Sequence, residues 1–196
     1  MGGIQNPAST RYCVFASLLV FFLAGCAAQP SAVDVERIDR VLVLIQQRLG
    51  YMDDVARNKW NTGAPIEDLP REREIIEGIG EQAPGYGLDP ATARDFFRAQ
   101  IEASKIIQTT RFTKWRAQNQ PPFRNLPGLR EHIRPALDAL TPEMMAALAA
   151  ALPALRTPGS AVVVNERAAA IVRVAPADIP ARATAVSPLV RLARPQ

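Results

Sequence analysis

Apolar residues recur at three- and four-residue steps between Val33 and Trp60, which is the pattern of one face of an α-helix. Only Gly50 interrupts this run, so we predict a single helix of roughly 40 Å, at about 1.5 Å per residue. Arg48 and Lys59 stand eleven residues apart, about three helical turns, and therefore project on the same side. Both border the apolar face, where a fully solvated charge is not expected. This face comprises Ile38, Val41, Leu42, Ile45, Leu49, Met52, Val55 and Ala56.

Two further helices have recognisable start signals. Asp68 is a candidate N-cap with Pro70 in the first turn, and its helix is expected to run past Ile79 before it fades. Asp89 is also followed by a proline, and opens a helix that continues without a breaker to about Gln118. These signals predict three long helical segments joined by short loops.

Some polar residues on these helices occupy unexpected positions. Ser104 and Gln108 lie one turn apart on the apolar stripe of the third segment, and buried polar groups need partners. Both an ordinary interhelical hydrogen bond and a ligand contact remain open for this pair. Asp68, Arg71 and Glu72 share one face near a helix start, which suits a charged surface or a binding site. The apolar members of the stripe are Phe97, Ile101, Phe112 and Trp115.

The chain after Pro121 is harder to assign. A fourth helical stretch is expected at 126–140, and Pro142 is expected to end it and to open a separate short helix at 144–152. The pattern weakens further after Pro153. Residues 161–164 favour a strand or a helix equally, 166–174 are predicted to be helical, and the proline-containing tail 176–196 is expected to be irregular or loosely packed.

Residues 1–25 have the features of an export signal. Arg11 supplies their only charge, and the apolar run 13–23 is too short to span a bilayer as a helix. The segment ends in Leu23-Ala24-Gly25-Cys26, which resembles the lipobox of bacterial lipoproteins, in which Cys26 would be lipidated. Ordinary signal cleavage nearby is the alternative. We predict an exported, periplasmic protein that is lipid-anchored to the outer membrane through Cys26, or otherwise soluble in the periplasm.

The composition excludes several classes of function. Without the leader the formal net charge falls from +4 to +3, and no dense Lys/Arg block indicates nucleic-acid binding. Cys26 is then the only cysteine, so no intramolecular disulfide can form. The single histidine, His132, has no Cys or acidic pattern near it, and we predict no metal site. The remaining chain of about 170 residues is long enough for one domain with a substantial core.

The candidate functional residues are cations accompanied by neutral hydrogen-bond donors. The sequence contains no nucleophile–base pair, metal pattern or phosphate-binding loop. Such a set suits a small dicarboxylate held in a fixed shape, with catalysis by positioning and electrostatics. The cations are Arg48, Lys59, Arg71 and Arg130, and the neutral donors are Ser104 and Gln108.

These residues occur in the order and spacing of a known family. Arg48, Lys59, the Asp68-x-x-Arg71-Glu72 block and the Ser104-x-x-x-Gln108 pair resemble the all-helical AroQ class of chorismate mutases. The leader, the Pro65-Ile66-Glu67-Asp68 stretch and Arg111-Phe112-x-x-Trp115 resemble its secreted, gamma subclass, and the resemblance covers roughly residues 33–140. It implies an all-α bundle with long first and third helices and a helical C-terminal extension. It also implies a homodimer without a cofactor that acts on chorismate, an intermediate of the shikimate pathway to aromatic amino acids.

The resemblance implies a role for each of these residues. Lys59 and Gln108 would donate hydrogen bonds to the ether oxygen of chorismate, which gains negative charge as it becomes prephenate. The substrate carboxylates would be held by Arg48, Arg71 and Ser104, and Asp68 and Glu72 would orient the ring hydroxyl or the cations.

One family position departs from the pattern. Short cytosolic members borrow an arginine from the partner's first helix, where this chain has Ser31. The secreted subclass takes an arginine from beyond its third helix, and Arg130 matches it best, with Arg124 and Arg134 as rivals. We therefore predict a site built within one chain, with Arg130 binding the substrate.

The organisation predicted from these patterns has four parts. They are a signal peptide at 1–25, a catalytic helical core at 33–120, a helical extension at 121–175 that completes the site, and the irregular tail at 176–196. Two alternatives to a chorismate mutase stay open at this stage. They are a related isochorismate-pyruvate lyase and a non-catalytic periplasmic helical lipoprotein on the same scaffold.

Overall fold

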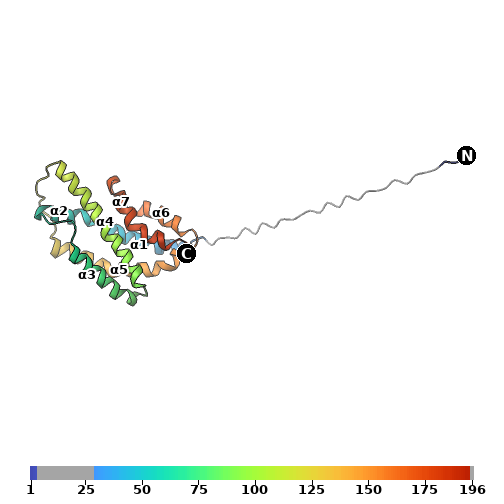
Figure 1. Ribbon diagram of the computed structural model, residues 1–196, viewed down its shortest axis with the longest axis horizontal. Helices are drawn as coiled ribbons and strands as arrows, with labels where there is room; N and C mark the ends of the chain where they lie inside the picture. The colour runs from blue at the N-terminus through green and yellow to red at the C-terminus, as the bar shows by residue number, and fades with distance from the viewer. Residues whose placement is uncertain (4–28, 195–196) are drawn as a thin grey trace.

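The computed structural model describes residues 1–3 and 29–194, and these contain seven α-helices and no strand (Figure 1). The all-α prediction is therefore confirmed. The predicted leader and Cys26 lie outside the described residues. Three short helical turns are also present, η1 (Ala83–Tyr86), η2 (Leu129–Ile133) and η3 (Pro176–Asp178). The α-helices are α1 (Ala32–Gly50), α2 (Met52–Thr62), α3 (Leu69–Gln82), α4 (Pro90–Ala117), α5 (Arg134–Leu155), α6 (Ser160–Ile171) and α7 (Ile179–Leu192).

The predicted single helix from Val33 to Trp60 is wrong, because it is interrupted after Gly50. The backbone N–H of Tyr51 donates to the carbonyls of Arg48 and Leu49 and does not continue the α-helical pattern. Glycine has low helix propensity and commonly marks such kinks. The interruption allows α1 to pack mainly on α5 while α2 packs on α4.

Helix starts agree with the predicted caps. The Asp68 carboxylate accepts a hydrogen bond from the backbone N–H of Arg71 at 3.3 Å, and the Asp89 carboxylate accepts one from Thr92 at 2.8 Å. Each cap satisfies one of the N–H groups that the first helical turn leaves free. Both N-cap predictions are thus confirmed, and α4 ends within one residue of its predicted end.

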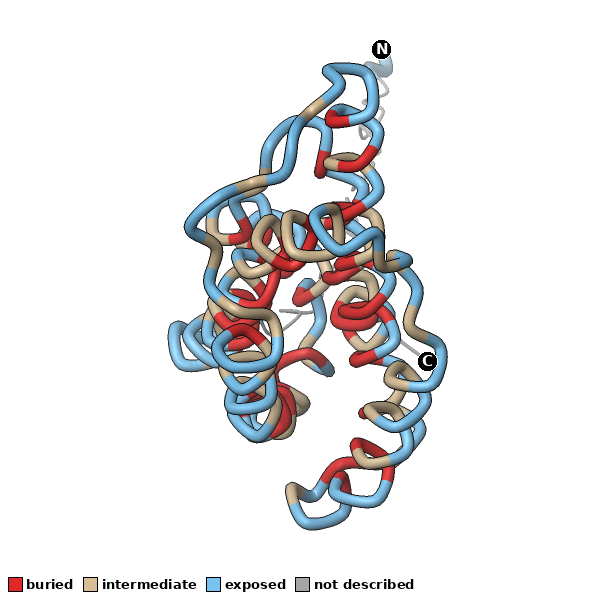
Figure 2. The backbone as a smooth tube through the Cα atoms, turned by 90° about the vertical axis from the view of Figure 1, so that its left-hand side faces the viewer, coloured by how far each residue is buried: buried red, intermediate tan, exposed pale blue. Residues whose placement is uncertain are grey.

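The helices bury their apolar sides against one another, as Figure 2 shows by the red positions on their inner faces. Phe96 and Phe97 of α4 meet edge to face at 5.3 Å between ring centroids, at the centre of the main core. A smaller cluster joins α2 to the far end of α4 through Trp60, Phe112 and Trp115. The long helix α4 therefore contacts both clusters and forms the centre of the bundle.

The predicted break at Pro142 is wrong, since α5 continues through it as one helix. A proline inside a helix removes one hydrogen bond and crowds the preceding turn, which costs about 3 kcal/mol. Pro142 lies on the exposed side, where water can solvate the freed carbonyl, while Met144, Met145 and Leu148 are fully buried on the other side. The apolar burial outweighs the local cost.

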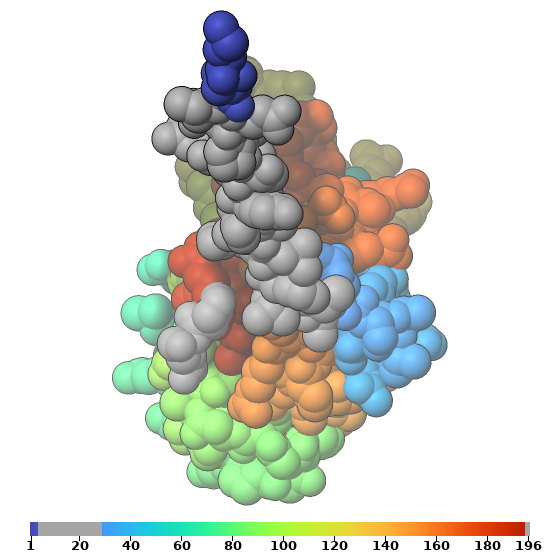
Figure 3. Space-filling view, turned by 90° about the vertical axis from the view of Figure 1, so that its right-hand side faces the viewer, coloured from blue at the N-terminus to red at the C-terminus, as the bar shows by residue number. Residues whose placement is uncertain are grey.

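The predicted irregular tail is also wrong, because most of it forms α7, which packs on α4 and α6. Ala185 and Leu189 of this helix are fully buried. Pro188 lacks the N–H that would bond the Thr184 carbonyl, and the Ser187 hydroxyl donates to that carbonyl at 2.9 Å instead. Figure 3 shows α1, α6, α7 and the end of α5 gathered on one face of the molecule. Residues 161–164, left open between strand and helix, belong to α6.

Two ion pairs connect α4 to the C-terminal segment. Arg111 donates two hydrogen bonds to Asp178, at 3.2 and 2.9 Å, and its Nε also pairs with Asp53 of α2. Asp178 is only 1% exposed. The second pair, Asp95 with Arg191 at 2.5 Å, lies on the surface. The Arg111–Asp178 pair contributes more to the free energy of unfolding than the surface pair. If one partner were removed, the other charge would stay in a place where water hydrates it poorly.

We expect Asp178→Asn to lower the free energy of unfolding by about 2–3 kcal/mol, because Arg111 keeps only one partner in a mostly buried place. Asp95→Asn removes a surface pair between the same parts of the molecule and should cost less than about 1 kcal/mol. Urea denaturation of both variants measures the difference. Equal losses would contradict the importance of the buried pair.

Candidate active site

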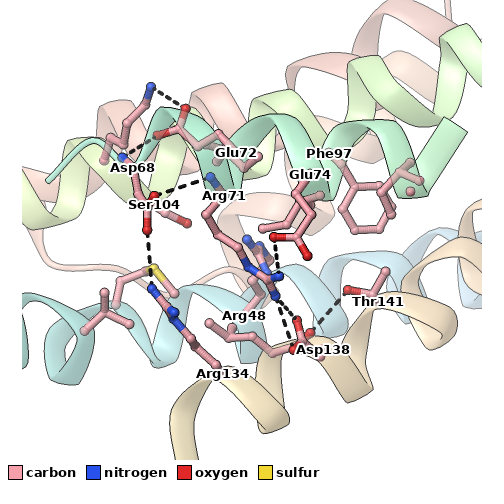
Figure 4. Close-up of a pocket in the computed structure, with 18 of the residues that line it drawn as sticks. Arg48, Asp68, Arg71, Glu72, Glu74, Phe97, Ser104, Arg134, Asp138 and Thr141 are labelled. Atoms are coloured by element: carbon pink, nitrogen blue, oxygen red, sulfur yellow. Dashed lines mark hydrogen bonds and ion pairs between the residues drawn. The ribbon is translucent and has the colours of Figure 1, made fainter. Parts of the chain in front are cut away.

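A cavity of about 640 Å³ opens between α1, α2, α3, α4 and α5. Figure 4 shows Arg48, Arg71 and Arg134 reaching into it from three different helices. Seven of the eight predicted site residues line this cavity, namely Arg48, Lys59, Asp68, Arg71, Glu72, Ser104 and Gln108.

Arg48 is the most buried cation of the cavity, with 8% of its surface exposed. It lies in the last turn of α1, where the partial negative charge of the helix C-terminus favours a cation. Burial lowers the pKa of its guanidinium to about 10, and the Asp138 carboxylate acts in the opposite direction. Its Nε is buried without a hydrogen-bond partner among the described residues. The guanidinium thus stays charged at neutral pH and has donor capacity to spare.

Lys59 is held by the loop that follows its own helix. Gly63 adopts a left-handed conformation, with φ of 67°, and turns the chain back after α2. The Ile66 carbonyl consequently accepts a hydrogen bond from Lys59 Nζ at 2.6 Å. Burial lowers the pKa of the ammonium group, while the carboxylates of Asp68 and Glu72 oppose that shift. The chain therefore presents a partly dehydrated, fixed ammonium group to the cavity.

The start of α3 carries a reciprocal set of hydrogen bonds. Asp68 caps the helix through one carboxylate oxygen and accepts from Arg134 at 3.3 Å through the other. Glu72 accepts from the backbone N–H of Asp68 at 3.2 Å and from Lys105 Nζ at 3.2 Å. Each acid thereby combines a structural task with contact to a cation at the cavity wall.

Ser104 and Gln108 are buried on the cavity side of α4, and their bonds stay within that helix. The Ser104 hydroxyl donates to the Gln100 carbonyl at 2.7 Å, and the Gln108 amide donates to the Ser104 carbonyl at 3.1 Å. An interhelical hydrogen bond, the ordinary explanation for such a pair, is not present among the described residues. The Gln108 amide oxygen is buried without a partner there, and its nitrogen has a second N–H to donate.

Arg71 reaches across the cavity mouth from α3 to α5. It donates to the two Asp138 oxygens at 3.1 and 3.4 Å and pairs with Glu74 at 2.9 Å. The hydrogen bond with Glu74 raises the pKa of Arg71 above its ordinary value, and the Asp138 charge adds to that effect. Arg71 is therefore a permanently charged guanidinium that is already occupied by two acids.

The structure does not bring Arg130 to the cavity. Its side chain is exposed and lies outside the cavity, whereas Arg134, one of its two rivals, lines the cavity. Residues 129–133 form a π-helical turn, which is wider than the α-helical turn assumed for the spacing and rotates the following residues. Arg124, the other rival, is exposed as well.

Sequence reasoning missed five charged residues of the cavity, namely Glu74, Glu77, Glu81, Lys105 and Asp138. Asp138 lies four residues after Arg134, which is one turn along the same helix face, so its position follows once Arg134 is assigned. Five basic and six acidic side chains line the cavity, so the cations are closely matched by acids. The basic residues are Arg48, Lys59, Arg71, Lys105 and Arg134, and the acidic residues are Asp68, Glu72, Glu74, Glu77, Glu81 and Asp138.

Residues 1–3 and 29–194 contain neither a cluster of metal ligands nor a helix that could span a membrane. No group of three or more His, Cys, Asp or Glu side chains in that part of the chain could hold a metal ion. None of its helices has both the length and the hydropathy that crossing a bilayer would require.

Residues 33–109 match the family model described as chorismate mutase type II. The chain is 30% identical to a secreted chorismate mutase from Mycolicibacterium smegmatis over 146 aligned residues. This alignment covers 74% of this chain and 80% of the relative. A chorismate mutase structure from Burkholderia thailandensis superposes with a TM-score of 0.73 at 35% identity, covering 78% of this chain and 98% of that one. A secreted chorismate mutase structure from Yersinia pestis superposes with a TM-score of 0.60 at 27% identity. The superposition covers 76% of this chain and 95% of that one.

Substituting Arg134 and Arg130 in turn tests whether the cavity is the site that binds the substrate. Arg134→Ala removes a guanidinium from the cavity and should raise the KM for chorismate about tenfold or more, which is typical of a lost charged hydrogen bond. Arg130→Ala removes an exposed guanidinium outside it and should change KM by less than about twofold. Steady-state kinetics with unchanged helical circular dichroism measure both. The reverse order would show that the substrate lies elsewhere.

Proposed function

We propose, from the premise that this chain belongs to the chorismate mutase type II family, that its cavity is where chorismate is rearranged to prephenate. The observation that carries this proposal is the convergence of three donors in one 640 Å³ cavity. They are a buried guanidinium with an unpaired Nε, a fixed ammonium group and an amide nitrogen that has one N–H beyond its bond to Ser104. Such donors suit a dianion whose ether oxygen becomes more negative in the transition state.

The rearrangement needs no proton transfer and no covalent intermediate. The carbon–oxygen ether bond breaks while a carbon–carbon bond forms, and the electrons move in a closed ring of six. Lys59 and Gln108 donate to the ether oxygen, so they bind the transition state more strongly than the substrate. Because Ile66 and Ser104 already hold these two side chains, little reorganisation is required when charge develops.

The carboxylates of chorismate are held by the remaining donors. Arg48, Arg71 and Ser104 have this role, and Arg134 takes the place first assigned to Arg130. Asp68 and Glu72 hold Arg134 and Lys105 at the wall, and Asp68 also caps α3. Every one of these side chains comes from a single chain, so catalysis does not require a partner's residue.

We also propose the larger organisation of the protein. Residues 33–120 form the catalytic core, and 121–175 complete the site, which Arg134 and Asp138 of α5 support. The family resemblance favours a homodimer, which sedimentation equilibrium of the purified protein tests. A monomer with full activity would reject the dimer and leave the single-chain site intact.

The purified protein without its leader should consume chorismate, followed as loss of chorismate absorbance, and should release prephenate alone. Lys59→Ala should lower kcat by about 10²–10³, the usual cost of a lost transition-state donor. Lys114→Ala is the matched control, because this exposed lysine at the end of α4 lies outside the cavity. Equal activity of the two variants would refute the role of Lys59, and release of pyruvate would indicate a lyase.

The identity of residue 108 determines the pH dependence. An amide donates at any ordinary pH, so kcat/KM of the natural protein should be nearly flat from mildly acid to mildly alkaline conditions. It should fall only at higher pH, when Lys59, whose pKa is lowered by burial, loses its proton. In Gln108→Glu the carboxyl group can donate only when protonated. This variant should be impaired at neutral pH and recover as pH falls through its carboxyl pKa. A profile identical to that of the natural protein would show that Gln108 is not the ether-oxygen donor.

The leader and the relatives described as secreted support an exported protein. We propose that Cys26 carries a lipid that anchors the protein to the outer membrane. Cys26→Ser should then move the protein from the membrane fraction to the soluble fraction and abolish fatty-acid labelling. Equal partitioning of both proteins would favour ordinary signal cleavage and a soluble periplasmic enzyme.

A further inference from the structure

Asp138 places a carboxylate at the mouth of the cavity, next to cations that the substrate needs. Its two oxygens accept hydrogen bonds from Arg71 at 3.1 and 3.4 Å, and Figure 4 shows it directed at the arginine side chains. Its side chain is 59% exposed, and that of Arg71 is 30% exposed. The pair is therefore accessible from solvent and can exchange partners.

Two acids of the cavity wall have structural tasks that Asp138 lacks, and Glu74, the second acid on Arg71, pairs with it from the same helix at 2.9 Å. Asp68 caps α3, and Glu72 accepts from the backbone at the same helix start. The hydrogen bonds of the Asp138 carboxylate within residues 1–3 and 29–194 are those from Arg71 alone. Asp138 lies in the second turn of α5, whose N-cap is Ile133, so it caps no helix end.

The pair bridges two walls of the cavity that are held by different neighbours. Arg71 belongs to α3, which packs mainly on α4, whereas Asp138 belongs to α5, which packs mainly on α1. A carboxylate of the substrate that binds Arg71 must enter this gap. It can share the guanidinium with Asp138 or displace it, and in either arrangement two negative groups approach one cation.

We propose that Asp138 is a resident carboxylate that competes with a substrate carboxylate for Arg71 and thereby sets the KM of the enzyme. This inference rests on the proposed role of Arg71 in binding chorismate. Asp138 contacts neither Lys59 nor Gln108, so it acts on substrate binding and leaves the chemical step unchanged. It raises the concentration of chorismate needed for half-saturation.

Asp138→Asn keeps the shape of the side chain and removes its charge. It should lower KM for chorismate about three- to fivefold at low ionic strength, with kcat within about twofold, as a partly exposed charge pair allows. The effect should shrink at about 0.5 M salt, because added ions screen exposed charges. Asp138→Glu keeps the charge and should keep KM at or above its natural value. Melting temperatures of both variants check that the fold is intact.

Asp95→Asn is the matched control, since it changes the net charge equally but breaks the surface pair with Arg191 outside the cavity. Its KM should be unchanged. A KM that stays constant or rises in Asp138→Asn would overturn the proposal, and a rise would mean that Asp138 holds Arg71 in place for the substrate. An equal fall in Asp95→Asn would also overturn it, because the effect would then belong to net charge.

Arg71→Ala separates failure of this inference from failure of the proposed function. If Arg71→Ala raises KM and Asp138→Asn does not lower it, the competition by Asp138 is refuted, and the role of Arg71 in substrate binding stands. If Arg71→Ala leaves KM unchanged, the role of Arg71 in substrate binding fails and the competition fails with it.

Discussion

The position of α4 depends on the buried ion pair between Arg111 and Asp178. This helix supplies Ser104, Lys105 and Gln108 to the cavity on one side and packs against α7 on another. The Arg111 guanidinium also pairs with Asp53 of α2, the helix that carries Lys59. A single cation, with its side chain 22% exposed, therefore connects the buried Asp178 of the C-terminal segment to the two helices that present Lys59 and Gln108. A buried charge permits little displacement, because any shift leaves it without hydrogen bonds and without water.

The cavity contains several cationic side chains, and nearly all of them are paired with an acid or a carbonyl of the same chain. A cation removed from water is unfavourable unless an acid or a carbonyl compensates it, and each cation of the site illustrates one solution. Arg134 pairs with Asp68, Lys105 with Glu72, and Lys59 with the Ile66 carbonyl. This pairing keeps the donors of the cavity in place. The lining nevertheless contains slightly more acids than bases.

Arg48 is the exception to this pairing, and its surroundings explain how the fold tolerates it. It lies in the last turn of α1, where the partial negative charge of the helix C-terminus favours a cation, and the Asp138 carboxylate adds a negative charge nearby. Its Nε has no partner among the described residues. An unpaired buried donor is costly for folding, and a bound carboxylate would satisfy it.

The sequence by itself determined the helical class, the caps at Asp68 and Asp89, the extent of α4 and seven of the residues that line the cavity. These follow from local rules, since a cap, a helix period or a motif spacing involves residues that are close along the chain. Tertiary structure decided the break after Gly50, the continuation of α5 through Pro142, the packed helix α7 and the position of Arg134, rather than Arg130, at the cavity. At Pro142 and in α7, the local preference was small compared with the burial of apolar side chains from distant segments. That burial exists only once the helices pack together, and no spacing along the chain records it.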